Sequence, residues 1–211
     1  MEPATERVRV LFVDGRPVVR EGIAALLAGD ASIELVGQAG TVAAALERVG
    51  RLRPDVLLTD TRLADGTALD VIAGACRGDI GPRVVLLTDL SGDVAARRAL
   101  AAGAQGYLLT TQADHHLLDA IHAAMAGRCI VDAGVGRQVQ QAGHDGDFGP
   151  REIQILQGVA QGLSNRAIGV ALSLTEGTVK NYVARLLEKL AARDRTHAVV
   201  IALRRGVIEL N

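Results

Sequence analysis

The chain has 211 residues, 49% of them hydrophobic and 22% charged, so it can bury the core of one or two domains and is not disordered throughout. Its acidic start is followed by only a short apolar stretch, and no apolar run approaches the ~18 residues of a membrane helix. We therefore expect no signal peptide, no membrane partner and a cytoplasmic location. Two isolated cysteines, Cys76 and Cys129, exclude a zinc ribbon and argue against a disulfide framework.

The formal net charge of -1 conceals an asymmetry along the chain. Residues 1–147 hold 14 Arg and no Lys against 19 Asp and Glu, a net of -5, whereas residues 148–211 hold 9 Lys and Arg against 5 acids, a net of +4. A basic region on a small domain is typical of a surface for polyanions. On this count alone, a merely solvated charged surface is an equal alternative.

Short apolar runs alternate with amphipathic stretches through the first part of the chain. The runs lie at 8–13, 33–36, 56–59, 84–87 and 107–109, and the periodicity predicts helices over 17–28, 41–50, 67–77, 91–102 and 112–126. Nearly continuous Val/Leu runs between helices predict a parallel sheet covered on both faces. Pro17 suits a first helical turn, Gly29 and Asp30 a helix end, and Thr41 or Ser91 an N-cap. We expect a doubly wound, five-stranded α/β domain over residues 1–127.

The segment 128–147 loses this alternation, and glycine is frequent from Gly134 onward, so we interpret it as a linker. The fragment Gly134-Val135-Gly136 follows no convincing strand and lacks the third glycine of a nucleotide loop. Four helical segments follow, at about 150–161, 164–171, 175–190 and 194–205, with no strand between them. Residues 148–211 are therefore expected to form an all-α, four-helix domain.

Four polar residues follow or end predicted strands: Asp14, Asp60, Thr88 and Thr110. Ligands of doubly wound sheets bind outside the carboxyl ends of the strands, and in a flavodoxin-like strand order the ends of the first and third strands are neighbours. Ordinary strand-end polarity explains any one of these residues alone. The joint pattern indicates an acidic pocket.

Residues 7–127 resemble the receiver domain of two-component response regulators of the NarL/FixJ class. The resemblance is carried by Val13-Asp14-Gly15-Arg16-Pro17-Val18-Val19-Arg20-Glu21-Gly22, Arg53-Pro54-Asp55-Val56-Leu57-Leu58-Thr59-Asp60-Thr61-Arg62-Leu63 and Ala102-Gly103-Ala104-Gln105-Gly106-Tyr107-Leu108-Leu109. It implies that Asp60 is at the phosphoacceptor position, that Thr88 is the switch hydroxyl and that Tyr107 is the switch aromatic residue.

Two positions depart from the pattern that this resemblance implies. Family members carry two adjacent acids after the first strand, which bind Mg²⁺ together with the phosphoacceptor, but here Asp14 is followed by Gly15. Loss of one carboxylate weakens a site for a small, hard cation. The family lysine after the fifth strand is replaced by Thr110, which cannot supply a charge-assisted contact to a phosphoryl group. We expect an atypical receiver with no bound metal and no cofactor.

Arg16 lies two residues after Asp14 in the first loop of the predicted pocket. Its guanidinium could pair with Asp14 or Asp60 and stand in for both the metal and the missing lysine. The alternative is that Arg16 is a solvated residue at the start of a helix, where loops tolerate a cation although helix starts do not favour one.

The segment 175–190 divides into two faces on a 3.6-residue period. One face is apolar and the other carries Lys180, Asn181, Ala184 and Arg185; the apolar residues are Val179, Val183, Leu186, Leu187 and Leu190. The preceding short helix begins at Ser164 and Asn165 and is joined to this one by three residues. This is the arrangement of a helix-turn-helix, whose second helix enters the major groove.

Residues 148–208 resemble a LuxR-type helix-turn-helix domain, with Pro150-Arg151-Glu152, Gly162-Leu163-Ser164-Asn165, Thr175-Glu176-Gly177-Thr178-Val179-Lys180-Asn181-Tyr182-Val183 and Asp194-Arg195-Thr196 in register. By analogy with the family, Lys180 and Asn181 reach base edges, for which lysine and asparagine have suitable donors and acceptors. Residues expected at phosphates are Thr178, Tyr182, Arg185 and Lys189 on the same helix, with Ser164, Asn165 and Arg166 on the helix before it. Phe148-Gly149 replaces the usual Leu-Thr start of the domain.

The last helix repeats apolar residues at Val199, Val200 and Leu203, which serve either the four-helix core or the dimer contact that the family makes there. We favour a homodimer, since one recognition helix buries little surface and paired half-sites compensate for this.

The resulting prediction is a DNA-binding transcription regulator, not an enzyme, that binds double-stranded DNA. A small-molecule ligand or protein partner at the receiver domain would control it, in place of conventional aspartyl phosphorylation. The alternative is a conventional regulator phosphorylated on Asp60. A phosphatase-like enzyme lacks a second acid, a lysine and a nucleophile–base pair, and an interaction module that has lost DNA binding is the remaining alternative.

Overall fold

The computed structural model describes residues 7–76, 81–141 and 148–208. The chain divides into two compact units, one formed by residues 1–89 and 97–133 and the other by residues 90–96 and 134–211. None of the helices within the described ranges combines the length and the apolar character needed to cross a membrane.

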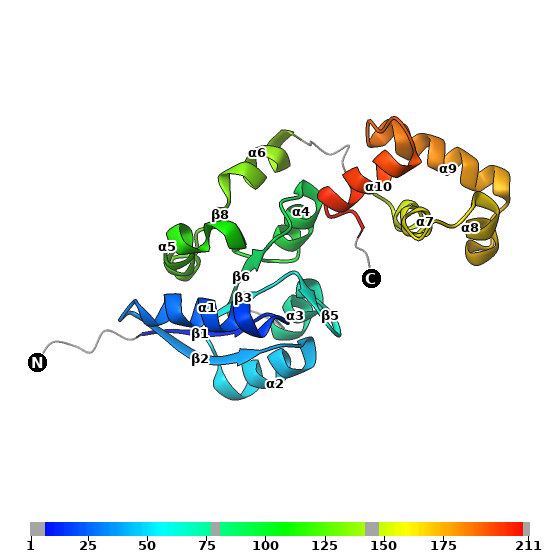
Figure 1. Cartoon of the computed structure of the whole chain (residues 1–211). Coiled ribbons are helices and arrows are strands. Elements are labelled where there is room, and N and C mark those ends of the chain that lie inside the picture. The colour runs from blue at the N-terminus through cyan, green and yellow to red at the C-terminus, as the bar shows by residue number, and fades with distance from the viewer. Residues whose placement is uncertain (1–6, 77–80, 142–147, 209–211) are drawn as a thin grey trace, which may run out of the picture. The chain divides into compact units, whose positions relative to one another are not determined.

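The first unit is built on a parallel sheet with the strand order β2-β1-β3-β6-β7-β8 (Figure 1). Its strands are β1 (Val8–Val13), β2 (Ile33–Ala39), β3 (Val56–Thr59), β6 (Arg83–Thr88), β7 (Gly106–Leu109) and β8 (Ile130–Val131). The first five strands have the flavodoxin-like order, so the predicted doubly wound fold is confirmed. Strand β3 is buried at every residue, as expected of a strand covered on both faces.

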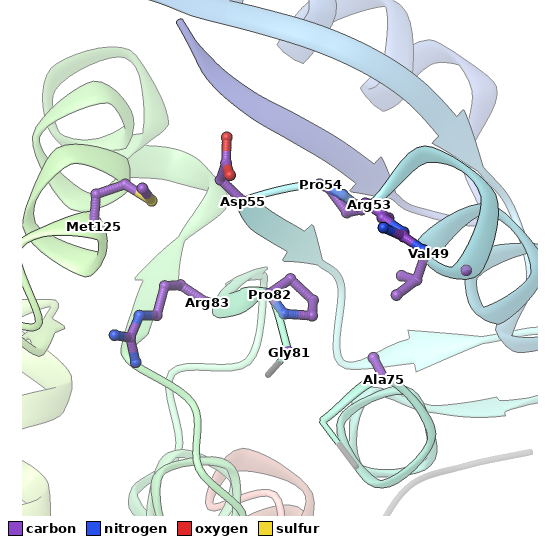
Figure 2. A pocket seen from close by; sticks show the side chains of 10 residues that line it. Val49, Arg53, Pro54, Asp55, Ala75, Gly81, Pro82, Arg83 and Met125 are labelled. Atoms are coloured by element: carbon purple, nitrogen blue, oxygen red, sulfur yellow. The ribbon is translucent and has the colours of Figure 1, made fainter. Parts of the chain in front are cut away.

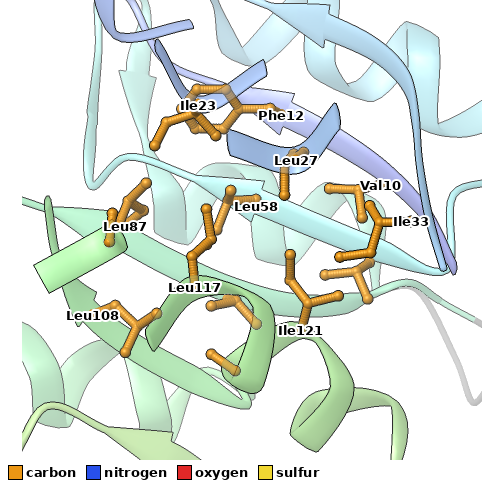
Figure 3. Close-up of a cluster of buried hydrophobic side chains, with 14 of the residues drawn as sticks. Val10, Phe12, Ile23, Leu27, Ile33, Leu58, Leu87, Leu108, Leu117 and Ile121 are labelled. Carbon is orange, nitrogen blue, oxygen red and sulfur yellow. The ribbon is translucent and has the colours of Figure 1, made fainter. Parts of the chain in front are cut away.

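Helices cover both faces of this sheet. They are α1 (Pro17–Ala28), α2 (Val42–Leu52), α3 (Ala68–Ala75) and α5 (Ala113–Met125), the last preceded by a short 3₁₀ turn at Thr110–Gln112. Helix α4 (Asp93–Ala101) is divided between the two units after Ala96. On one face, Ile23 and Leu27 of α1 and Leu117 and Ile121 of α5 pack over strand residues such as Leu58 (Figure 3). Pro17 occupies the first turn of α1, and the Thr41 hydroxyl accepts a hydrogen bond from Ala44 N–H at the start of α2.

The structure differs from the prediction at five elements. A sixth strand, β8, and a helix, α6 (Ala133–Gln141), lie in the segment that we predicted to be a linker. A small antiparallel pair, β4 (Arg62–Leu63) and β5 (Gly66–Thr67), follows β3. β8 has only two residues and is ordered by its parallel pairing with β7, so its sequence carries no strand periodicity. Helix α4 begins at Asp93, so Ser91 does not cap it.

The second unit contains α7 (Pro150–Ala160), α8 (Asn165–Leu172), α9 (Glu176–Lys189) and α10 (Arg195–Arg204). Apolar residues of these helices form one core, among them Ile155, Leu156, Ile168, Val179, Leu186, Ala198 and Ala202. Phe148 is buried against this core. Glu152 accepts a hydrogen bond from Gly149 N–H at 2.8 Å, so the Phe148-Gly149 start still supports an N-terminal cap for α7.

Helices α8 and α9 are joined by a tight turn. Ser173 ends α8 in the left-handed conformation (φ 56°), and Leu174 N–H donates to the Gly169 carbonyl at 2.8 Å. The Gly169 backbone lies so close to this turn that an added Cβ would be 2.7 Å from the Leu174 carbonyl oxygen. Glycine at 169 therefore permits the close connection that fixes α9 relative to α8.

Candidate functional site

The carboxyl ends of four neighbouring strands bring the predicted pocket residues together. Asp14 follows β1, Asp60 follows β3, Thr88 ends β6 and Thr110 follows β7. Because β1 pairs with β3, β3 with β6 and β6 with β7, the four positions lie along one edge of the sheet. Asp14, Asp60 and Thr88 are buried.

The guanidinium of Arg16 lies in this acidic pocket. Arg16 Nη2 is 2.9 Å from Asp14 Oδ2 and 3.5 Å from Asp60 Oδ2, and Nε donates to Asp14 Oδ1 at 3.1 Å. The other terminal nitrogen, Nη1, donates to Asp89 at 2.9 and 3.2 Å. The sequence left open whether Arg16 pairs with the acidic residues or is solvated, and in the structure it pairs with Asp14 and Asp60. The hydrogen bond with Asp14 is the main cause that raises the pKa of Arg16 above its usual value, so the guanidinium stays charged.

Asp60 lies among opposing influences. Burial raises the pKa of its carboxyl group, and the nearby charge of Asp14 raises it further. Hydrogen bonds from Thr61 N–H, at 2.6 Å, and the charge of Arg16 act against this rise. The net direction is upward, so Arg16 compensates only part of the cost of two buried carboxylates.

The residues present do not fit the Mg²⁺ site that a receiver fold implies. A small divalent ion at this place needs the oxygens of Asp14 and Asp60, but both oxygens of Asp14 and Oδ2 of Asp60 face the Arg16 guanidinium, and Oδ1 of Asp60 accepts from Thr61 N–H. Gly15 contributes no carboxylate. Within the described part of the chain, no group of three or more His, Cys, Asp or Glu residues is arranged to hold a metal ion.

Two further predicted pocket residues have distinct surroundings, and sequence reasoning missed two others. Tyr107 is fully buried in β7, and the Thr110 hydroxyl is 3.4 Å from Asp89 Oδ1. Asp89, which pairs with Arg16, and Thr61, which binds both Asp60 and Thr88, were not predicted. Both directly follow residues that were singled out, so a search of the positions after each strand end would have found them.

The predicted DNA-contacting residues lie on α8, α9 and the turns before them. Lys180, Asn181 and Arg185 are exposed on α9, whereas Val179 and Leu186 are buried on its other side; the predicted two-faced helix is thus observed. Ser164 and Arg166 are also exposed at the start of α8, and Asn165 between them is half-buried. Thr178 is half-buried beside its N-cap, Thr175, whose hydroxyl lies 2.8 Å away.

Lys189 and Tyr182, also predicted at phosphates, pack against other parts of the second unit. The Lys189 ammonium donates to Glu152 Oε2 at 2.9 Å and lies 4.5 Å from the centre of the Phe148 ring. Tyr182 is half-buried against the domain core. Lys189 therefore joins the end of α9 to the start of α7, which the sequence pattern did not reveal because Glu152 is 37 residues away.

A cavity of about 790 Å³ lies at the opposite, amino-terminal edge of the sheet (Figure 2). Its wall includes Asp55, before β3, and Arg83, the first residue of β6. The Asp55 carboxylate points away from Arg83 in this view (Figure 2) and accepts a hydrogen bond from Arg9 N–H at 2.8 Å. Its charged groups therefore do not converge on one point, as the polar groups of a ligand-binding site do.

The first unit has the fold of a receiver domain, and the second has a helix-turn-helix whose recognition helix, α9, has one exposed face. This combination is that of a response regulator with a DNA-binding output domain. Residues 10–122 match the response regulator receiver domain, and residues 147–202 match the bacterial regulatory proteins of the luxR family. The chain therefore belongs to the NarL/FixJ class of response regulators, and it is a DNA-binding transcription regulator of this family.

The relatives span nearly the whole chain. The DNA-binding transcriptional activator DevR/DosR of Mycobacterium tuberculosis is 36% identical and covers 92% of this chain and 94% of its own length. The nitrate/nitrite response regulator protein NarP of Escherichia coli is 34% identical and covers 95% and 97%. The transcriptional regulatory protein LiaR of Bacillus subtilis is 32% identical and covers 95% and 99%.

Solved structures agree with the two-unit fold. The response regulator ChrA of a heme-sensing two-component system is 30% identical, covers 96% of this chain and 99% of its own, and gives a TM-score of 0.57. RcsB of Salmonella enterica serovar Typhimurium, bound to a promoter, is 20% identical, covers 93% and 98%, and gives a TM-score of 0.73. At this low identity, the second likeness shows the fold alone.

Proposed function

We propose that this regulator binds double-stranded DNA through α9 and that its receiver domain is controlled without conventional phosphorylation of Asp60. The observation that carries the second part is the Arg16 guanidinium, which lies 2.9 Å from Asp14 and 3.5 Å from Asp60. The first part is supported by the luxR family match and by the relative described as a DNA-binding activator.

In this proposal, Lys180 and Asn181 on the exposed face of α9 read base edges in the major groove. Arg185 on the same face and the residues at the start of α8 contact phosphates. Thr178 and Tyr182, half-buried at the margins of that face, have hydroxyls suited to the same role. A regulator with such contacts works where the chromosomal DNA is, in the cytoplasm.

We also propose that two chains act together on DNA. Val200 of α10 is 41% exposed, whereas Ala198 and Ala202 on the same helix are buried. The apolar residues of α10 are thus divided between the core and the surface, and a second copy of the chain would cover the exposed part. Paired recognition helices on two half-sites would supply the surface that one short helix lacks.

The chemistry of the pocket supports control by a small-molecule ligand or protein partner. A phosphoryl group on Asp60 would place about two negative charges beside the Asp14 carboxylate, in place of the single charge of the free Asp60 carboxylate. Arg16 is the cation that pairs with the Asp14 and Asp60 side chains, and it is already shared among three carboxylates. A signal that acts by binding, rather than by phosphoryl transfer, avoids this requirement.

The alternative is a conventional regulator in which Asp60 is phosphorylated despite Gly15 and Thr110. Incubation with acetyl phosphate and Mg²⁺, followed by intact-mass measurement, separates the two. We expect no adduct on the wild-type chain. An adduct that disappears in Asp60→Asn would establish the conventional alternative.

A matched variant makes the negative result informative. Gly15→Asp combined with Arg16→Ala restores the second acid and removes the guanidinium, and an added Cβ at position 15 meets nothing closer than the Gly40 carbonyl oxygen at 3.8 Å. We expect this variant to gain a Mg²⁺-dependent rise in melting temperature that the wild-type chain lacks. A comparable rise in the wild-type chain would contradict the proposed control.

A further inference from the structure

The first residue of α10 reaches back to the start of the helix-turn-helix. Arg195 Nη1 donates to the side-chain oxygen of Asn165 at 3.3 Å, and Nη2 donates to the Leu163 carbonyl oxygen. Arg195 and Asn165 are both half-buried and stand 30 residues apart in the sequence. One guanidinium therefore holds both the turn before α8 and the first side chain of that helix.

This contact fixes which end of the Asn165 amide faces outward. A guanidinium has donors and no acceptor, so the amide must present its oxygen, Oδ1, to Arg195. The amide nitrogen, Nδ2, with its two N–H groups, is then directed away from Arg195. The neighbouring Ser164 hydroxyl accepts a hydrogen bond from Ala167 N–H at 3.1 Å, so it already caps the helix.

We infer that Arg195 is a positioning residue for DNA binding, which holds Asn165 so that Nδ2 donates to a backbone phosphate. The inference rests on the proposed function, because α8 crosses the sugar–phosphate backbone when α9 lies in the major groove. Phosphate oxygens only accept hydrogen bonds, so the amide must approach them with its nitrogen. Without Arg195 the amide is free to rotate and to present its oxygen, which phosphate repels.

The test is a double-mutant cycle on Asn165 and Arg195, with binding to a mixed-sequence duplex measured over a series of salt concentrations. Asn165→Ala should weaken binding by about tenfold, the effect of losing roughly one hydrogen bond to a charged group. Because asparagine is neutral, the salt dependence should not change. The control Arg166→Ala removes a cation beside it and should lower the salt slope by about one.

Arg195→Lys keeps the positive charge but loses the fork that reaches both acceptors. It should weaken binding about as much as Asn165→Ala does, by roughly tenfold, and the double variant should bind no more weakly than either single variant. Additive losses would overturn the inference, since the two residues would then act separately. Melting temperatures are measured in parallel, and losses of binding that track them across the series would show a merely structural role and also overturn it.

Asn165→Asp keeps the test independent of any folding defect in the arginine variant. The carboxylate still accepts from Arg195, so the melting temperature should not fall, but a second oxygen now faces the phosphate. We expect weaker binding than with Asn165→Ala, and binding equal to wild type would overturn the inference. If the wild-type chain and Lys180→Ala both fail to bind any duplex, the proposed function fails, and the inference fails with it. If the wild-type chain binds, and Lys180→Ala weakens this binding but Asn165→Ala does not, the inference alone is overturned.

Discussion

The hydroxyl oxygens of Thr61 and Thr88 lie 2.7 Å apart, and both side chains are buried beside Asp60. The Thr61 hydroxyl is also 3.3 Å from Asp60 Oδ1. Thr88 is thus held by Thr61, which follows the neighbouring strand, within a connected set of polar groups. Such a set is stabilising as long as every member has a partner.

Valine at either threonine should therefore destabilise the first unit. Thr61→Val or Thr88→Val keeps the shape of the side chain but leaves a buried hydroxyl without this partner, at a cost of about 1 kcal/mol. The double variant should cost less than the sum, because the second change removes the group that the first one orphaned. Urea unfolding of the four proteins measures this coupling, and strict additivity would show that the two hydroxyls are energetically independent.

Arg16→Ala should lower the free energy of unfolding by about 2 kcal/mol. Removing one member of a buried ion pair leaves its partner uncompensated, but the cost is moderated here because the Arg16 side chain is 41% exposed. Adding Asp60→Asn to Arg16→Ala should recover part of the loss, since one of the two buried charges is then gone. Chemical denaturation of both variants is the measurement; an Arg16→Ala protein as stable as wild type would mean that the pairing contributes nothing.

The stability difference between Asp60→Asn and the wild-type chain should depend on pH. Since burial and Asp14 raise the pKa of Asp60 in the folded state, the folded chain retains a proton that the unfolded chain has lost, and this contribution to stability falls as pH increases. Asp60→Asn is free of that loss. Its advantage should therefore grow from about pH 4, near the usual aspartate pKa, toward neutrality.

Comparing the two proteins at each pH removes the effect of the other carboxylates. Hydrogen bonds lower the pKa of Asp65 and Asp194, and such groups produce the opposite trend in both proteins. Unfolding curves at matched pH values give the difference directly. An advantage that is constant over the range would show that Asp60 titrates normally.

We expect Lys189 to have a structural role and Arg185 to have a role in DNA binding. Lys189→Met keeps the apolar stem but loses the 2.9 Å contact with Glu152, so we expect a loss of about 1 kcal/mol in stability and an unchanged salt dependence of DNA binding. Arg185→Ala, at an exposed position, should leave stability unchanged and reduce the salt slope by about one. If Lys189→Met instead reduced the salt slope and Arg185→Ala instead reduced stability, the two roles would be exchanged.

The sequence predicted the regular architecture closely because its periodicities are strong. Strand β1 and helix α1 have the predicted bounds, and the strand order that joins Asp14 to Asp60 is as expected. β8 was missed because two residues carry no period, and α6 because Gly134 and Gly136 lie inside it. Pairwise geometry was the other limit: no local pattern indicates that Arg16 also reaches Asp89, 73 residues away, or that Lys189 reaches Glu152.

The fold of the second unit depends on Gly169, although this residue carries no charge and makes no contact with DNA in the proposed function. Even a methyl group there would collide with the Leu174 carbonyl oxygen, so the turn would have to open and α9 would move away from α8. A random search for loss-of-function alleles should therefore recover substitutions at this inconspicuous glycine as readily as at the exposed lysine of α9. Such alleles would be deficient in operator recognition while retaining every side chain that meets the duplex.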